Sequence, residues 1–250
     1  MQEYSIDFEA PSPLAMLLEL RAPLDWASLV YRAPQLVRAP KGDGRPVMLI
    51  PGYGTDETSM RPLGRYLEYL GYDVYDWGQG RNRGDVENDI RRVGQRTQEI
   101  CEARGDQPVT LIGWSLGGVS AREAARLFEP SVREVITLGT PIIGGPKYTS
   151  VGRQFARKAN LDLDAFELEV HQRNAIGIKQ PVTSIYSKAD GVVSWRASVD
   201  SYNPQARNIE VRSSHFGLGA NGKVWNLIAR LLSESSTRED STTRPRELTA

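Results

Sequence analysis

The chain has 250 residues, of which 40% are hydrophobic and 25% are charged, a size and composition typical of one large globular α/β domain. Its 31 basic side chains are balanced by 31 acidic ones. This balance argues against a nucleic-acid-binding protein, which usually has an excess of basic residues. The single cysteine excludes an intrachain disulfide, and neither a secretory signal nor a membrane-spanning apolar stretch is evident, so the sequence predicts a cytoplasmic protein without a transmembrane segment.

Residues 1–45 are rich in apolar residues and prolines and contain an interrupted helical pattern between positions 12 and 30. This pattern predicts an N-terminal strap that packs over the core of the protein. An interfacial segment making transient contact with a lipid surface is the alternative, which the mixed charges of the segment disfavour.

From position 46 onward, short apolar runs alternate with segments of helical periodicity. Such alternation predicts a mostly parallel central sheet flanked by helices on both faces. Strands are expected at 47–50, 72–76, 109–112, 132–138, 181–186 and 208–211. Helices are expected at 59–70, 86–104, 116–128 and 225–232.

The stretch 142–179 interrupts this alternation and is too long for a simple connection. It contains two short helical patterns, near 151–159 and 165–173, and predicts a small helical cap or lid inserted into the domain spanning 46–233. The last residues, 234–250, are almost entirely polar and predict a disordered tail.

The most specific motif joins the third predicted strand to the following helix. Gly113, Ser115 and Gly117 match the G-x-S-x-G nucleophile elbow, in which a tight turn holds a serine hydroxyl clear of the sheet. The flanking positions come too close to other backbone for side chains, which explains the glycines. Ser115 is therefore the predicted nucleophile, and a glycine-rich turn with an accidental serine is the alternative.

A serine nucleophile needs a general base, and the chain contains only two histidines. His215 lies between the last predicted strand and the last helix, where a loop reaches the carboxyl edge of the sheet. His171 lies in the inserted stretch, within a run typical of a surface helix. His215 is therefore the predicted base, and His171 is assigned a structural role.

The base needs a carboxylate that fixes its tautomer and stabilises its protonated form. Asp190 follows the fifth predicted strand and precedes a glycine, and the chain order Ser115, Asp190, His215 is the one expected for a nucleophile elbow of this kind. Asp162 and Asp164 in the inserted stretch are the alternatives, and Asp200 is a weaker one.

An oxyanion that forms during acyl transfer needs two N–H donors. The backbone N–H of Leu116, directly after the serine, is one candidate. Tyr53, in the glycine-rich turn after the first strand, is the other. Alternatively, the glycines around Tyr53 serve only to let the turn pass close to the elbow.

These blocks of sequence resemble the bacterial lipase and esterase branch of the α/β-hydrolase fold, over about residues 46–232. The resemblance rests on 49–54, 113–118, 138–141, 186–193 and 214–218. Trp114 and Ile142 depart from it, because many related lipases carry histidine at these positions. The resemblance therefore implies a serine esterase rather than a secreted triglyceride lipase.

The implied activity is hydrolysis of a small hydrophobic carboxylic ester through an acyl-enzyme. Neither a metal nor an organic cofactor is expected, since two histidines and one cysteine are too few for a metal-ligand cluster. The substrate pocket is expected to involve Trp114, Ile142, Ile143, Phe155 and Phe166. An acyltransferase or thioesterase with the same residues is the alternative, a non-catalytic binding protein of the same fold is a third, and no pattern indicates an oligomeric state.

Overall fold

The computed structural model describes residues 8–12 and 14–243 of the chain. Within them, six strands form one sheet in the order β2-β1-β3-β4-β5-β6, and every adjacent pair is parallel. The strands are β1 (Pro46–Ile50), β2 (Asp73–Asp76), β3 (Val109–Trp114), β4 (Val132–Leu138), β5 (Val182–Tyr186) and β6 (Arg207–Glu210). The predicted parallel sheet is confirmed.

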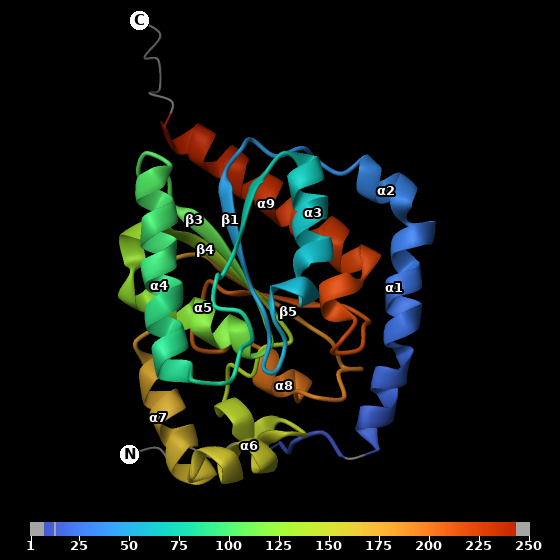
Figure 1. Ribbon diagram of the computed structural model, residues 1–250, viewed down its shortest axis with the longest axis vertical. Coiled ribbons are helices and arrows are strands. Elements are labelled where there is room, and N and C mark those ends of the chain that lie inside the picture. Colours follow the sequence, from blue (N-terminus) through green and yellow to red (C-terminus); the bar gives the residue numbers. More distant parts are fainter. Residues whose placement is uncertain (1–7, 13, 244–250) are drawn as a thin grey trace, which may run out of the picture.

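Helices connect the strands and cover both faces of the sheet (Figure 1). The α-helices are α1 (Ala22–Tyr31), α2 (Ala33–Val37), α3 (Arg61–Leu70), α4 (Val86–Ala103), α5 (Leu116–Leu127), α6 (Gly152–Ala159), α7 (Leu163–Ala175), α8 (Trp195–Ser198) and α9 (Gly222–Thr243). Short 3-10 helices are η1 (Ala15–Arg21), η2 (Glu57–Ser59), η3 (Glu129–Ser131), η4 (Gly145–Tyr148) and η5 (Leu218–Ala220).

The core is divided by the sheet because successive side chains of a strand point to opposite faces. In β1, Val47 and Leu49 pack with residues of α3 and α9, whereas Met48 and Ile50 pack with residues of α4 and α5. Each strand that is buried on both faces therefore reads as a continuous apolar run, which is the pattern seen in the sequence.

Strand register brings the functional loops together. Ile50 of β1 is paired with Gly113 of β3, and Leu138 of β4 is paired with both Trp114 and Ile185. Because the strands are parallel and end nearly level, the loops that follow β1, β3, β4 and β5 leave the same edge of the sheet. Helices α6 and α7 of the inserted stretch lie at one end of the molecule (Figure 1).

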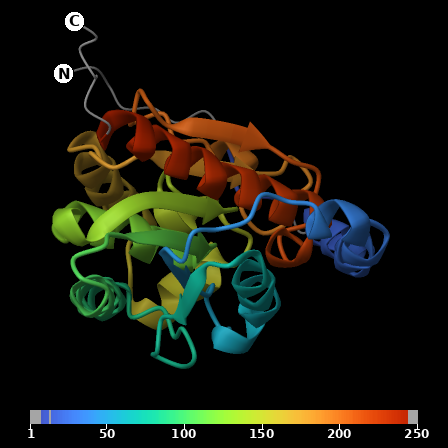
Figure 2. The ribbon, with the colours of Figure 1, turned by 90° about the horizontal axis from the view of Figure 1, so that it is seen from above.

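Helices lie near both ends of the described chain. The N-terminal residues form η1, α1 and α2, and α1 and α2 lie beside α9 (Figure 2). At the other end, α9 continues to Thr243, so the tail predicted to be disordered from position 234 is helical as far as that residue. Residues 244–250, the rest of the predicted tail, lie outside the described residues.

Candidate active site

Ser115 occupies the turn between β3 and α5 with φ 54° and ψ −122°, a backbone conformation that residues other than glycine rarely adopt. Such backbone strain costs of order 1–3 kcal/mol and persists only where surrounding structure enforces it. A Cβ added at Gly113 would lie 2.4 Å from the Cα of Gly118, and one added at Gly117 would lie 2.3 Å from the carbonyl oxygen of Ile50. Close backbone packing therefore requires glycine on both sides of the serine.

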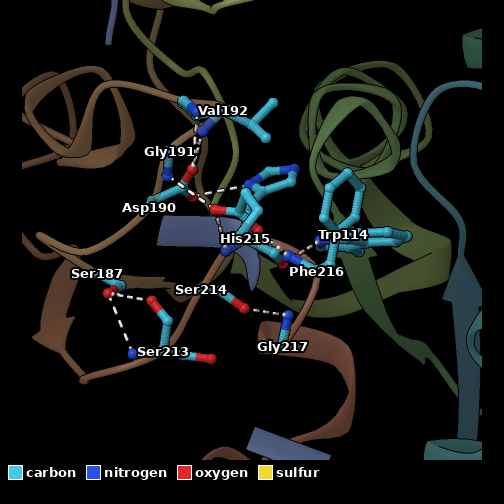
Figure 3. Close-up of polar contacts among 12 residues, drawn as sticks. Trp114, Ser187, Asp190, Gly191, Val192, Ser213, Ser214, His215, Phe216 and Gly217 are labelled. Atoms are coloured by element: carbon cyan, nitrogen blue, oxygen red, sulfur yellow. Dashed lines mark hydrogen bonds and ion pairs between the residues drawn. The ribbon is translucent and has the colours of Figure 1, made fainter. Parts of the chain in front are cut away.

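His215 and Asp190 form a buried pair in the loops that follow β6 and β5 (Figure 3). The imidazole Nδ1 lies 2.7 Å from Asp190 Oδ2, and the two residues are only 2% and 6% exposed. The other carboxylate oxygen, Oδ1, accepts hydrogen bonds from the backbone N–H groups of Val192 at 2.8 Å and Val193 at 2.7 Å. The carboxylate is thus fixed with one oxygen directed at the imidazole.

Ser115 is joined to this pair through its neighbours in the sheet. Its N–H donates to the carbonyl oxygen of Leu138 at 2.8 Å, and a Cβ on the next residue, Gly139, would lie 2.9 Å from Asp190 Oδ2 and 3.1 Å from His215 Nδ1. The indole N–H of Trp114, which precedes the serine, donates to the carbonyl oxygen of His215 at 3.2 Å (Figure 3). These contacts place the serine turn beside the loops that carry His215 and Asp190, although the three residues are far apart along the chain.

The environment of His215 raises its pKa above the ordinary value for histidine. Burial acts against this, because it disfavours the charged imidazolium. The negative charge of Asp190, its hydrogen bond to the ring and the charge of Glu19 outweigh the effect of burial. The pair is suited to accept a proton and to stabilise the imidazolium that results.

Glu19 of η1 holds the loops that carry this pair, and no sequence motif singles it out. Its Oε1 accepts the N–H groups of Gly191 at 2.8 Å and His215 at 2.9 Å, and its Oε2 accepts that of Phe216 at 2.9 Å. The residue is 8% exposed. A single buried carboxylate thus connects the loops of the acid and the base, and the only sequence signal for it is an acidic residue within an apolar run.

Asp25 of α1 supports the histidine loop from its other side. Its Oδ2 accepts the N–H and the hydroxyl of Ser214, both at 2.9 Å, and its Oδ1 accepts the side-chain amide of Asn221 at 2.8 Å. The N-terminal helices therefore do more than cover the core, because they position the loop that carries His215.

The two residues whose N–H groups are expected to bind an oxyanion belong to segments that lie close to Ser115. Leu116 begins α5, and Tyr53 follows Gly52, where an added Cβ would lie 3.2 Å from the Cβ of Ser115. Within the described residues, neither the N–H of Leu116 nor that of Tyr53 has a hydrogen-bond partner. The buried Asn82 holds this turn, since its side-chain amide donates to the Pro51 carbonyl at 3.0 Å.

A pocket with about 800 Å³ of empty space opens at Ser115. Helices α5 and α7 supply many of the lining residues. The others come from the turn after β1, the start of α4, the loop after β4, η4, α6 and the loop after β5. Its walls are mostly apolar, and the residues that line it include Tyr53, Ser115, Leu116, Val119, Ile142, Phe155, Phe166 and Val170. A pocket with such walls suits an apolar group of a small molecule.

Three of the five predicted pocket residues, Ile142, Phe155 and Phe166, line this pocket, and two do not. Trp114 belongs to the hydrophobic core, 7% exposed, with its indole directed to the His215 carbonyl. Ile143 packs instead against a small cluster beneath the inserted helices. The prediction was wrong for these two residues because adjacent residues on an extended segment point in opposite directions.

The alternative base and two alternative acids lie elsewhere. His171 of α7 has its Nδ1 2.9 Å from the hydroxyl of Tyr202. Asp162 caps α7 by accepting the N–H groups of Asp164 and Ala165. Asp164 itself is exposed and pairs with a lysine of η4.

Asp200 is also engaged in structure. Its Oδ2 lies 2.6 Å from Nη1 of Arg122, and both side chains are almost fully buried. The pKa of Asp200 is lowered: burial raises it, but the Arg122 charge and hydrogen bonds from Asn203 and Arg122 outweigh burial. Arg122 lies on α5 and lines the pocket, so this ion pair forms part of the support of the pocket wall.

A parallel sheet with a strained serine at a strand–helix turn, and a buried histidine–aspartate pair at the same edge, defines a protein of the α/β-hydrolase class. A family model described as the alpha/beta hydrolase family matches residues 47–238. The chain belongs to this family.

Solved structures of similar fold agree with this assignment. The chain is similar to the mature lipase BlEst2 of Bacillus licheniformis, with a TM-score of 0.59, 15% identity, and 77% of this chain and 94% of the other covered. A monoacylglycerol lipase of Paleococcus ferrophilus gives a TM-score of 0.59, 15% identity, and coverages of 79% and 97%. A thioesterase domain from the curacin biosynthetic pathway gives a TM-score of 0.52, 15% identity, and coverages of 78% and 93%.

At these identities the likeness shows the fold alone. No curated protein matches the sequence of the chain.

Proposed function

We propose that the chain is a serine hydrolase that cleaves carboxylic esters through an acyl-enzyme. The observation that carries this proposal is the 2.7 Å contact between His215 Nδ1 and Asp190 Oδ2, next to a serine held in a strained turn. With Nδ1 engaged by the carboxylate, the second ring nitrogen, Nε2, is left to exchange a proton with the serine hydroxyl.

The proposed reaction has two halves. In the first, the Ser115 oxygen attacks the ester carbonyl carbon while His215 Nε2 accepts the hydroxyl proton. The N–H groups of Leu116 and Tyr53 stabilise the oxyanion, and each such donor contributes roughly 2.7–4 kcal/mol in enzymes of this mechanism. The tetrahedral intermediate then loses the alcohol, which takes the proton from His215, and Ser115 remains acylated.

In the second half, water attacks the acyl carbonyl carbon. His215 accepts a proton from the water, the bond between the serine oxygen and the acyl carbon breaks, and the proton returns to Ser115. The mostly apolar pocket supports an acyl group of hydrophobic character. The inserted stretch contributes Phe155 and Phe166 to its walls, so this stretch helps to select the acyl group.

A thioesterase is the second candidate, and one structural neighbour is a thioesterase domain. An acyltransferase would use the same residues, with an alcohol in place of water in the second half. Neither alternative changes the role of Ser115. They differ from an esterase only in the leaving group or in the acceptor.

The test is a chain-length series of p-nitrophenyl esters with matched acyl thioesters, run with and without added alcohols. An esterase is expected to hydrolyse the esters with a larger kcat/KM than the thioesters and to release free acid even with alcohol present. Preference for the thioesters, or acyl transfer to the alcohol as the main reaction, would replace the proposal with one of the alternatives. No turnover of any substrate would contradict both hydrolase proposals.

A further inference from the structure

Residues 14–41 form most of the N-terminal strap that the sequence predicts at 1–45, and below the name strap means these residues. They expose many large apolar side chains. Single exposed apolar residues are common on proteins, but a contiguous set marks an interaction site. Leu20 is 76% exposed and Val30 is 79% exposed. The full set in the strap is Leu14, Met16, Leu17, Leu20, Leu24, Trp26, Val30, Tyr31 and Val37.

Helical geometry aligns these side chains on the outer side of the strap. In η1, residues three apart eclipse one another, so Leu17 and Leu20 extend the line begun by Leu14. In α1, Leu24 and Tyr31 are seven residues apart and share one line, whereas Trp26 and Val30 are four residues apart and share a second line on the exposed half of the helix. Figure 2 shows α1 at the edge of the molecule, beyond α9, which leaves this side open.

Three polar side chains of the strap point inward. Glu19 and Asp25 accept hydrogen bonds from the loop of His215, and the hydroxyl of Ser28 accepts the N–H of Gly222 at 2.8 Å. Ordinary surface helices bury their apolar stripe against the core and turn polar residues outward. Leu36 and Ala39 of the strap do pack into the core, but its polar contacts are also turned inward, and apolar groups cover its free side.

This arrangement also separates the charges of the strap. Both of its acidic residues, Glu19 and Asp25, are the inward ones just described. Its basic residues are Arg21, Arg32, Arg38 and Lys41, and no carboxylate of the described residues forms an ion pair with any of them. Arg32 packs against Gly222, and Lys41 lies over the ring of Tyr69. The charges of the strap that remain beside its exposed apolar side chains are therefore those of Arg21 and Arg38, and both are positive.

We infer that the strap binds the surface of an anionic lipid bilayer. Exposed leucine and tryptophan side chains on short helices, flanked by arginine and lysine, are features of segments that lie in the membrane interface. Basic residues near an anionic surface strengthen such binding. The inference goes beyond the proposed ester hydrolysis and does not depend on it.

A second copy of the chain fits this surface less well. A symmetric dimer buries the same patch of each copy, so Arg21 and Arg38 of both copies would be enclosed in one interface. No acidic side chain of the strap is free to offset the repulsion between these arginines.

The inferred contact is with the membrane surface. Within residues 8–12 and 14–243, no helix has the length and apolar character that a membrane span requires.

The test is sedimentation of the full chain with vesicles of phosphatidylcholine alone and of phosphatidylcholine with phosphatidylglycerol. The chain is expected to bind the anionic vesicles and to bind them less at high salt. Replacing Leu20, Leu24 and Val30 together by serine, or Arg21 and Arg38 together by glutamine, is expected to weaken binding roughly tenfold or more. Circular dichroism melting verifies that each variant is folded.

The matched control replaces Leu127 and Ile176 together by serine. These two residues are 66% and 76% exposed and lie outside the strap. This variant is expected to bind like the unmodified chain. An absence of vesicle binding, equal binding to both vesicle types, or an equal loss in the control would overturn the inference. So would a dimer in analytical ultracentrifugation that the leucine and valine substitutions abolish, since a second copy would then occupy the surface.

Discussion

At the scale of single residues, Asp190 fixes which nitrogen of His215 carries the ring proton. Replacing it by asparagine retains the size of the side chain but removes the charge that stabilises imidazolium. We expect Asp190→Asn to lower kcat on the order of ten-thousand-fold, the effect found for this change in serine proteases. Steady-state kinetics with the best ester of the series measures it.

The control for this change is Asp162→Asn, which alters the N-cap of α7. The kcat of this variant is expected to stay within a few-fold of that of the unmodified enzyme. Near-normal activity in Asp190→Asn would show that a different carboxylate serves His215.

Glu19 gives a second prediction at this scale, because its charge raises the pKa of His215. Glu19→Gln removes that charge and also disturbs the hydrogen bonds to Gly191 and Phe216. Since the base must be neutral, a lower pKa moves the acid limb of the kcat/KM profile to lower pH, while mispositioning lowers the plateau. The pH–rate profile separates the two effects, and an acid limb that stays in place or moves to higher pH would contradict the role assigned to Glu19.

Single residues also show what sequence can and cannot reveal. Ser115, Asp190 and His215 were predicted because each follows a strand, and parallel strands deliver such residues to one edge. Glu19 and Asp25 were not, because their partners lie nearly 200 positions away along the chain and no motif connects them. Trp114 and Ile143 were misassigned to the pocket because side-chain direction depends on local backbone geometry.

At the scale of elements, the turn between β3 and α5 depends on glycines that admit no side chain. Gly113→Ala places a methyl group 2.4 Å from the Gly118 Cα, and backbone at this depth has little room to move. We expect the variant to lose its activity and to unfold at a temperature several degrees lower, because overpacking costs about 1–3 kcal/mol.

Gly219→Ala is the control, since its nearest neighbour would be a methionine sulfur at 3.7 Å. Thermal melts and ester hydrolysis of both variants test the point. Equal behaviour of the two variants would remove the steric explanation of the elbow.

Element boundaries were predicted to within a few residues where apolar periodicity was strong. The strands at 132–138 and the helix beginning at 86 agree with β4 and α4. The end of α9 was not predicted, because the residues after position 234 carry no apolar signal and only the structure shows that the helix continues through them. The outward apolar side of the strap was equally hidden, since periodicity reveals a stripe but not the side on which it packs.

At the scale of the whole molecule, a buried carboxylate makes stability depend on pH. Burial, with a smaller effect of Asp85, raises the pKa of Asp89 in α4 to about 6, and its Oδ2 has no hydrogen-bond partner among the described residues. In the unfolded chain the group ionises near pH 4, so folding opposes ionisation, and stability falls as pH rises from about 4 to about 6.

Asp89→Asn removes this penalty. We expect its Tm to exceed that of the unmodified protein by several degrees at pH 8, with the difference lost near pH 4. Melting curves across this pH range measure it. A difference that is the same at both pH values would show that ionisation of Asp89 does not control it.

The proposed nucleophile is tested most directly by covalent labelling with a fluorophosphonate, followed by peptide mapping. One adduct per chain is expected, on the peptide that contains Ser115, and Ser115→Ala is expected to abolish it while the protein remains folded. Labelling at a different residue, or undiminished labelling of the folded Ser115→Ala variant, would contradict the assignment of this serine as the reacting group.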